Sequence, residues 1–310
     1  MNISFEILID RHARELEIRN FSPRTIEDMV YSMKHLTRFL RERKLERVKK
    51  ISPAVLNDFH HWLFYQPTKR GAVRSAGNLN QVLAKVKGFF RFLKAEGELK
   101  TNPAEALEYA REPQRLPRNI LTPQEAKRII ERVDGSTAQG YRDRVMLEVF
   151  YATGIRQSEL INLSVGDVRL EEGLLFIREG KGRRDRVVPL GGMACKYLET
   201  YLKGVRPELL KGRATDRLFI SYRGKPMDRN SVGKLVRKYA KLAKVSKPVS
   251  CHVWRHTCAT HLLKNNANLR HVQEILGHRS LATTERYLHL TIADLKEAHR
   301  RFHPREKALQ

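Results

Sequence analysis

The sequence predicts a mainly α-helical protein with two domains: a four-helix N-terminal domain, and a mostly helical C-terminal domain that contains a small antiparallel β-sheet. Apolar residues recur at three- and four-residue spacing through most of the chain, which is the period of helices that bury one face. Residues 168–190 instead contain two short runs that are typical of strands. The chain has 310 residues, more than a single hydrophobic core usually serves, so we expect two domains.

Four helical segments are predicted within residues 1–112, the first of them over 5–19. The second begins at Ser22-Pro23, an N-cap followed by proline at the first helical position. Ser52-Pro53 begins the third in the same way, and this helix ends near Tyr65. The apolar residues of the second and fourth segments recur at helical spacing: Ile26, Met29, Val30, Met33, Leu36 and Leu40, then Leu79, Val82, Leu83, Val86, Phe89, Phe90 and Leu93 before Gly97.

A linker over residues 113–119 is predicted to join these helices to the second domain, residues 120–310. The segment EPQRLPRN, which ends at Asn119, carries two prolines and no apolar period. Directly after it, Thr122 and Glu125 form the pattern of a capping box, so a new helix begins here.

The second domain is predicted to contain one hairpin followed by helices. The runs 174–177 and 186–190 flank the polar turn EGKGRRD and indicate two antiparallel strands with a basic tip. Residues 229–302 return to helical spacing. The breaks in that spacing are at Pro248, Asn265-Asn266, Gly277 and Thr291.

The formal net charge of +26 makes a polyanion the first candidate partner, and basic residues exceed acidic ones on both sides of the linker. No run approaches the ~18 apolar residues of a membrane-spanning helix, and the start turns charged before any signal-like stretch. The three cysteines, Cys195, Cys251 and Cys258, suit reduced thiols better than a disulfide framework. We therefore expect a soluble, cytoplasmic protein without a membrane partner.

Several signatures of common enzymes are missing from the sequence. It contains no GxxxxGK[ST] phosphate loop, no GxGxxG after a strand, no HExxH and no GxSxG. Nucleotide-driven, dinucleotide-dependent, zinc-protease and serine-hydrolase functions therefore lack support, and we expect neither a cofactor nor a metal.

The densest group of chemically active side chains is CHVWRHTCATH, which begins at Cys251. Three interpretations of it are open. His252 and Arg255 share a helix face and could meet one phosphate. A zinc site could use Cys251, His252, His256, Cys258 and His261, although no CxxC pair completes it. A solvated basic helix is the third.

Six blocks, in order, resemble those of the tyrosine recombinases, also called phage-type integrases, and most closely their Xer-like members. The blocks are ATGIRQSEL (152–160), GKGRRDRVVPL (180–190), HVWRH (252–256), LGH (276–278), TTERYLH (283–289) and HPR (303–305). One position departs from the pattern, because Trp254 stands where a smaller apolar residue is usual. The resemblance covers essentially the whole chain and implies a SAM-like core-binding domain before a catalytic domain.

The resemblance also implies a set of catalytic residues. Arg156 and Arg255 would clamp the scissile phosphate, His252 and His278 would flank it, and Lys181 would lie in the hairpin turn. Tyr287 would be the nucleophile, nine residues after His278. Glu159 falls on a supporting carboxylate position, where it would orient Arg156 or His252.

General chemistry supports this division of roles. A phosphodiester under attack gains negative charge on its non-bridging oxygens, and two guanidinium groups can stabilise that charge without a metal. A tyrosine hydroxyl, with a pKa of about 10, must lose its proton during attack, so a nearby base such as His252 is expected. The 5′ oxygen that leaves needs a proton, which Lys181 could deliver. A phosphotyrosine bond keeps the energy of the broken phosphodiester, so rejoining needs no ATP.

The implied partner is double-stranded DNA with a specific recombination site. Candidate DNA contacts are Arg74, Lys85, Lys87 and Arg91 in the first domain, with Arg183 and Arg184 in the second. Arg186, close to these last two, is either a third phosphate contact or part of a solvated turn. The charged segment 291–303 resembles the element that family members donate to a neighbouring subunit. We expect a homotetramer or paired recombinases on two DNA sites, in the cytoplasm with the nucleoid.

Two alternatives remain open at this stage. A type IB topoisomerase would use the same kind of tyrosine chemistry to relax DNA without pairing sites. A DNA-binding protein could also retain the fold without catalysis, although all six catalytic positions are filled. RNA binding is less favoured, because no RNP-type strand or GXXG loop context is present.

Overall fold

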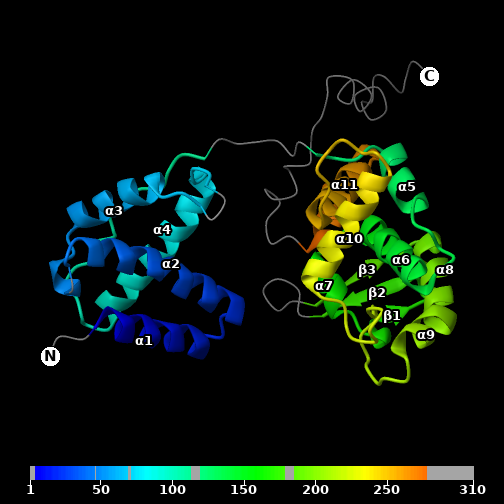
Figure 1. Ribbon diagram of the computed structural model, residues 1–310, viewed down its shortest axis with the longest axis horizontal. Coiled ribbons are helices and arrows are strands. Elements are labelled where there is room, and N and C mark those ends of the chain that lie inside the picture. The colour runs from blue at the N-terminus through cyan, green and yellow to red at the C-terminus, as the bar shows by residue number, and fades with distance from the viewer. Residues whose placement is uncertain (1–3, 46, 69–70, 113–118, 179–184, 278–310) are drawn as a thin grey trace, which may run out of the picture. The chain divides into compact units, whose positions relative to one another are not determined.

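The computed structural model describes residues 4–45, 47–68, 71–112, 119–178 and 185–277. The chain divides between residues 114 and 115 into two compact units, each with its own hydrophobic core. The predicted fold class is confirmed, because helices dominate and an antiparallel three-stranded sheet lies in the second unit (Figure 1). No helix within the described ranges is long and apolar enough to cross a membrane.

The N-terminal unit contains the four predicted helices. Their bounds, with one short 3-10 helix, are α1 Phe5–Ile18, α2 Pro23–Glu42, η1 Val48–Lys50, α3 Pro53–Tyr65 and α4 Ala76–Ala95. The N-caps at Ser22 and Ser52 are real, since each side chain accepts a hydrogen bond from a backbone N–H of the first turn. Phe89 and Phe90 of α4 are fully buried in the core that these helices share, so their rings are not available to stack on bases.

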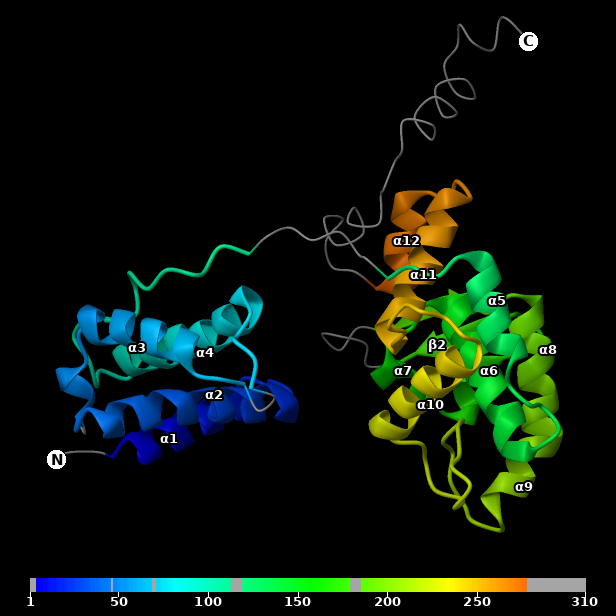
Figure 2. The same cartoon turned by 45° about the horizontal axis from the view of Figure 1, so that its top comes forward.

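The C-terminal unit surrounds its small sheet with helices (Figures 1 and 2). The elements before and within the sheet are α5 Pro123–Glu131, α6 Ala138–Thr153, α7 Gln157–Asn162, η2 Val165–Asp167, β1 Val168–Arg169, β2 Leu174–Ile177 and β3 Arg186–Pro189. Those after it are α8 Gly192–Thr200, the π-helical turn η3 Tyr201–Val205, α9 Arg206–Leu210, α10 Arg229–Leu242, α11 Cys251–Lys264 and α12 Leu269–Leu276. The predicted capping box of α5 is present, with Thr122 and Glu125 bonded reciprocally.

The sheet has the order β1-β2-β3, and both pairs of strands are antiparallel. The predicted hairpin is therefore correct, and the two-residue strand β1 adds to it. The register places Ile177 opposite Arg186 and Leu175 opposite Val188. Because side chains two apart in a strand share a face, Arg186 lies on the same face as the buried Val188.

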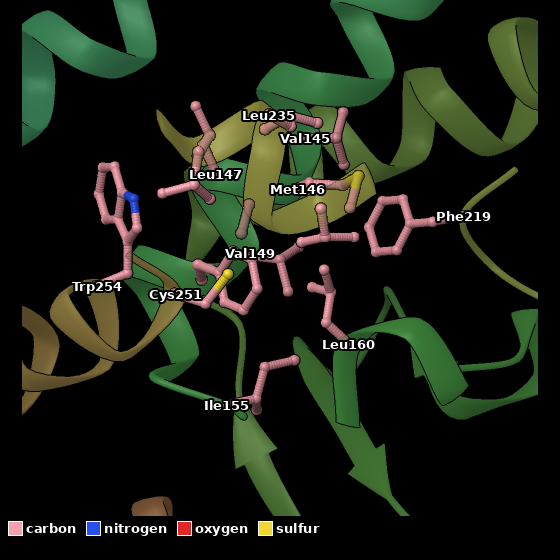
Figure 3. Packing of buried hydrophobic residues seen from close by; sticks show 14 of the residues in the cluster. Val145, Met146, Leu147, Val149, Ile155, Leu160, Phe219, Leu235, Cys251 and Trp254 are labelled. Carbon is pink, nitrogen blue, oxygen red and sulfur yellow. The ribbon is translucent and has the colours of Figure 1, made fainter. Parts of the chain in front are cut away.

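Helix α6 forms the centre of this unit and contacts α5, α8, α9 and α11. Its residues Val145, Met146, Leu147 and Val149 are all fully buried (Figure 3). Trp254 of α11 is also fully buried, and its ring meets Tyr151 of α6 edge-on at 5.8 Å between centroids. The unusual tryptophan therefore fills the core next to Arg255 without displacing that arginine.

Candidate active site

Arg156 stands at the junction between α6 and α7, where the chain reverses. Gly154 ends α6 in the left-handed region, with φ +59°, and Arg156 then occupies the N-cap of α7. A Cβ on Gly154 would lie 2.8 Å from Leu276 Cδ2 and 3.1 Å from Cys258 Sγ. The junction therefore needs glycine both for its conformation and for the close approach of α11 and α12.

Glu159 holds Arg156 from the first turn of α7. Its Oε2 accepts the backbone N–H of Arg156 at 2.7 Å, and its Oε1 accepts Arg156 Nη1 at 2.7 Å. Burial of this carboxylate, whose side chain is 4% exposed, would raise its pKa, but Arg186 and Arg156 together lower the pKa to about 2. Glu159 is therefore ionised at neutral pH. The predicted contact with Arg156 is present, and within the described residues Glu159 bonds to Arg156 and Arg186 and not to His252.

Arg255 reaches from α11 to the same junction. Its Nη1 donates to the carbonyl of Gly154 at 2.9 Å, and its Nη2 donates to the carbonyl of Leu276 at 2.7 Å. Arg156 Nη2 donates to the next carbonyl, that of Gly277, at 3.1 Å. The two arginines that the sequence analysis paired thus converge on consecutive carbonyls at the end of α12.

The arginines converge here because the end of a helix attracts positive charge. The last carbonyls of an α-helix have no partner within the helix and carry the negative end of its dipole. A third guanidinium contributes, because Arg186 Nε donates to the carbonyl of Ile275 at 3.0 Å. Three cations therefore hold residues 275–277, directly before His278.

His252 lies on α11, three residues before Arg255, and its side chain is exposed. Desolvation and the positive charges of Arg255, Arg156 and Arg229 lower the pKa of this imidazole. A histidine with a lowered pKa is neutral near pH 7 and can accept a proton. The geometry therefore provides a base next to two guanidinium groups.

Cys251, Cys258 and His261, from the same 251–261 cluster, are buried in the fold or bonded within it. Cys251 and Cys258 are buried, and burial raises the pKa of the Cys258 thiol to about 12. His261 contacts the hydroxyl of Tyr151 through Nδ1 and the carbonyl of Leu121 through Nε2, both at 2.9 Å. In the part of the chain that the structure describes, no three His, Cys, Asp or Glu side chains are grouped to hold a metal ion.

Five predicted site residues lie outside the described residues: Lys181, Arg183, Arg184, His278 and Tyr287. Their neighbours in sequence are described. Strand β3 begins at Arg186, and Gly277 ends α12 in the left-handed region, with φ +63°.

Arg186 begins the strand that the run 186–190 predicted, but its side chain does not belong to a solvated turn. This side chain is 12% exposed. Its Nη1 and Nη2 donate to the two carboxylate oxygens of Glu159 at 2.9 and 2.8 Å. The signal in the sequence was the position of Arg186 two residues before the apolar Val188 in a predicted strand, because alternate residues of a strand share a face.

The predicted DNA contacts of the N-terminal unit separate onto two faces of α4. Arg74, two residues before α4, and Lys85 line a groove between α2 and α4. Lys87 instead donates to the carbonyls of Glu105 and Leu107 on another face. Arg91 is exposed, four residues after Lys87 and therefore beside it on the helix.

Comparison with known proteins agrees with this geometry. A sequence model described as the phage integrase family matches residues 119–293, and a second, described as the phage integrase N-terminal SAM-like domain, matches residues 9–97. A protein of Ralstonia nicotianae named tyrosine recombinase XerC 2 is 36% identical over 96% of this chain and 85% of its own length. Tyrosine recombinase XerD of Staphylococcus haemolyticus is 33% identical over 97% of this chain and 99% of its own length.

Solved structures have the same fold. The structure of XerH site-specific recombinase in a post-cleavage complex with palindromic difH covers 94% of this chain and 83% of that one, with a TM-score of 0.73 at 23% identity. The structure of XerA recombinase covers 96% of this chain and 98% of that one, with a TM-score of 0.53 at 28% identity. Taken with the sequence relatives, these findings show that the chain belongs to the phage integrase family and is a tyrosine recombinase.

Proposed function

We propose that this chain is a site-specific DNA recombinase that cuts and rejoins duplex DNA through a 3′-phosphotyrosyl intermediate on Tyr287. The observation that carries the proposal is the convergence of Arg156 and Arg255 on the carbonyls of Gly277 and Leu276. Both guanidinium groups thereby lie beside the point where the chain enters the segment that carries Tyr287. Relatives named tyrosine recombinases favour this function over the topoisomerase alternative.

The two arginines supply the positive charge that phosphoryl transfer needs. A guanidinium group stays ionised and can bind two phosphate oxygens at once, so a pair of them can stabilise the charge that develops during in-line attack. Glu159 accepts one hydrogen bond from the backbone N–H of Arg156 and one from its Nη1, and the second bond removes conformational freedom from that guanidinium. The clamp therefore performs the charge neutralisation that metal ions perform in other phosphoryl-transfer sites.

The proton transfers follow from the remaining groups. Tyr287 attacks the phosphorus atom and its hydroxyl proton passes to His252, whose lowered pKa leaves the imidazole neutral. The bond to the 5′ oxygen breaks, and Lys181 gives a proton to that oxygen. His278 donates a hydrogen bond to the phosphate. A 5′ hydroxyl from a second strand reverses these steps and releases Tyr287.

We infer that both units bind the DNA. The net charge of +26 favours phosphate contact, and the groove between α2 and α4 presents Arg24, Lys34, Arg74 and Lys85. Lys87 has backbone partners of its own, so we rank it below Arg74 and Lys85 as a DNA contact. Arg183 and Arg184 stay candidates in the second unit.

Strand exchange needs two DNA sites, and we propose that four subunits assemble on them. A neighbouring fold is that of a lambda integrase tetramer bound to a Holliday junction, with a TM-score of 0.71 at 20% identity. The charged segment 291–303 is our candidate for the element exchanged between subunits. The reaction takes place on DNA, so we place the protein in the cytoplasm with the nucleoid.

Covalent capture in cells of the source organism tests the reaction class. Cells are lysed in denaturant, DNA linked to this protein is isolated and its ends are sequenced, with Tyr287→Phe as the control. We expect adducts that cluster at one locus and vanish in the variant. Dispersed adducts that depend on Tyr287 would support a topoisomerase instead, and adducts in neither strain would refute the proposed function.

A further inference from the structure

Arg186 connects three elements of the candidate site through a single guanidinium group. It belongs to β3, its two terminal nitrogens donate to Glu159 in the first turn of α7, and its Nε donates to Ile275 at the end of α12. The approach to α12 is close, because a Cβ on Gly277 would lie 3.0 to 3.2 Å from Arg186 Cδ, Nε and Cζ. Three segments that are far apart in sequence thus meet at one side chain.

The same carboxylate serves both arginines. Glu159 Oε1 accepts Arg156 Nη1 at 2.7 Å and Arg186 Nη1 at 2.9 Å, so the position of one guanidinium depends on the other through this oxygen. Removal of Arg186 would take two hydrogen bonds from this buried carboxylate and leave it bonded to Arg156 within the described residues. The end of α12 would also lose the hydrogen bond at Ile275, next to the carbonyls that Arg255 and Arg156 hold.

We propose that Arg186 is a positioning residue for strand cleavage: it orients Arg156 through Glu159 and holds the end of α12 against that guanidinium. The inference rests on the proposed function and adds a residue to it. Arg186 does not contact phosphate in this account, because its bidentate face is occupied by Glu159 and its side chain is largely buried.

The test compares Arg186→Met and Arg186→Lys with the matched control Arg178→Met. Arg178 follows the other strand of the same hairpin and also pairs with a carboxylate, Asp167, at 2.6 Å, but its side chain is 65% exposed. The first readout is the yield of Tyr287-dependent adducts in cells of the source organism. We expect a loss of about 100-fold for Arg186→Met, because misplacement of a catalytic group by about 1 Å has an effect of this size.

Arg186→Lys keeps the charge but cannot hold a carboxylate and a carbonyl in one planar fork, so we expect a comparable loss. Arg178→Met should retain the wild-type yield. Thermal unfolding followed by circular dichroism shows which variants fold. Should Arg186→Met not fold, Arg186→Lys and Glu159→Gln carry the test.

Two further readouts separate positioning from other roles. The salt dependence of binding to a short mixed-sequence duplex, measured by fluorescence anisotropy, should keep its slope in Arg186→Met, whereas loss of a phosphate contact lowers the slope by about 1. A double-mutant cycle combines Glu159→Gln with Arg186→Met. The double variant should lower the adduct yield no more than the more damaging single change does, since the two residues act as one unit.

The outcomes distinguish failure of the positioning role from failure of the proposed function. Wild-type adduct yield in a folded Arg186→Met or Arg186→Lys variant, a lowered salt slope, or additive effects in the cycle would overturn the positioning role and leave the proposed function standing. An absence of adducts from the wild-type protein would overturn the proposed function and this inference with it.

Discussion

Among the described residues of the C-terminal unit, one buried arginine–carboxylate network surrounds Asp143 and another surrounds Glu159, and they differ in what their guanidinium groups face. In the first, Asp143 of α6 accepts Nε and Nη2 of Arg142 and the hydroxyl of Tyr239 from α10. Arg142 Nη1 donates to the carbonyl of Ile220. All of these groups are buried, so the network joins α6, α10 and the segment around residue 220 inside the core.

In the second network, around Glu159, the guanidinium groups face the end of a helix. Arg156 and Arg186 converge on Glu159, and each also reaches a carbonyl at the end of α12. The side chain of Arg156 keeps 19% of its surface exposed. A buried ion pair alone therefore does not identify a site. What distinguishes this network is that its cations meet at a helix end, directly before the segment that carries the proposed nucleophile.

Exchange of Arg255, which shares the helix end with the Glu159 network, and of Arg142 in the core network should separate the two roles most strongly. Arg255→Lys removes the fork that holds Gly154 and Leu276, and we expect the adduct yield to fall about 1000-fold, as for the loss of a preorganised charge in other active sites. The matched change Arg142→Lys should lower stability but leave the yield per folded molecule near the wild-type value. An equal loss of adduct yield in both variants, measured below their unfolding temperatures, would mean that Arg255 has no catalytic role beyond the structural role of Arg142.

Deletion of the carboxylate in the core network should act on stability. Asp143→Ala leaves Arg142 buried and without its ion-pair partner, and it removes the acceptor of the Tyr239 hydroxyl. We expect the free energy of unfolding to fall by about 3 kcal/mol, as when one partner of a buried ion pair is removed. Calorimetry of the full chain measures this. A change below about 1 kcal/mol would mean that the network is weakly coupled to folding.

The Glu159 network should respond to acid in a defined direction. The pKa of Glu159 in the folded protein is about 2, below that of a glutamate in the unfolded chain. The contribution of Glu159 to folding stability is therefore complete above the unfolded pKa, and it is lost as the pH falls towards the folded pKa. Between about pH 5 and about pH 3, the stability difference between wild type and Glu159→Gln should narrow by about 2 kcal/mol. A difference that is constant over this range, in denaturant unfolding at several pH values, would contradict the lowered pKa.

The smallest effect is expected for Tyr239→Phe. This change removes one neutral donor to Asp143 and leaves the pair with Arg142 in place. The expected loss of stability is about 1.5 kcal/mol, because the acceptor is a carboxylate, with no change in adduct yield. A loss as large as that of Asp143→Ala would instead mean that the hydroxyl, and not the ion pair, holds α10 to α6.

Local signals in the sequence predicted the parts of the fold that have amphipathic faces and caps. Ser22, Ser52 and Thr122 each begin a helix as expected, and the hairpin lies at the predicted runs. Helix α6 is different, because residues on several of its faces are buried and no polar stripe marks its period. The sequence therefore could not show that α6 is the centre of the second unit.

The site was predictable where its residues stand in recognisable blocks. Arg156 and Glu159 are bonded to each other, Arg156 and Arg255 reach consecutive carbonyls, and the charges of both arginines act on His252. The contacts at residues 275–277 involve backbone carbonyls, for which no side-chain identity gives a signal. Arg186 was expected to contact phosphate or to be solvated, because charge near a glycine-rich tip usually faces solvent, whereas the pairing register of β3 places its side chain inward.

The most direct test of the account is the chemical identity of the protein–DNA bond. Adducts captured from cells are trimmed with nucleases and protease, and the nucleotide-bearing peptide is identified by mass spectrometry. The account predicts that the peptide containing Tyr287 carries a nucleotide joined through its 3′ phosphate. A nucleotide on another residue, or one joined through a 5′ phosphate, would contradict it.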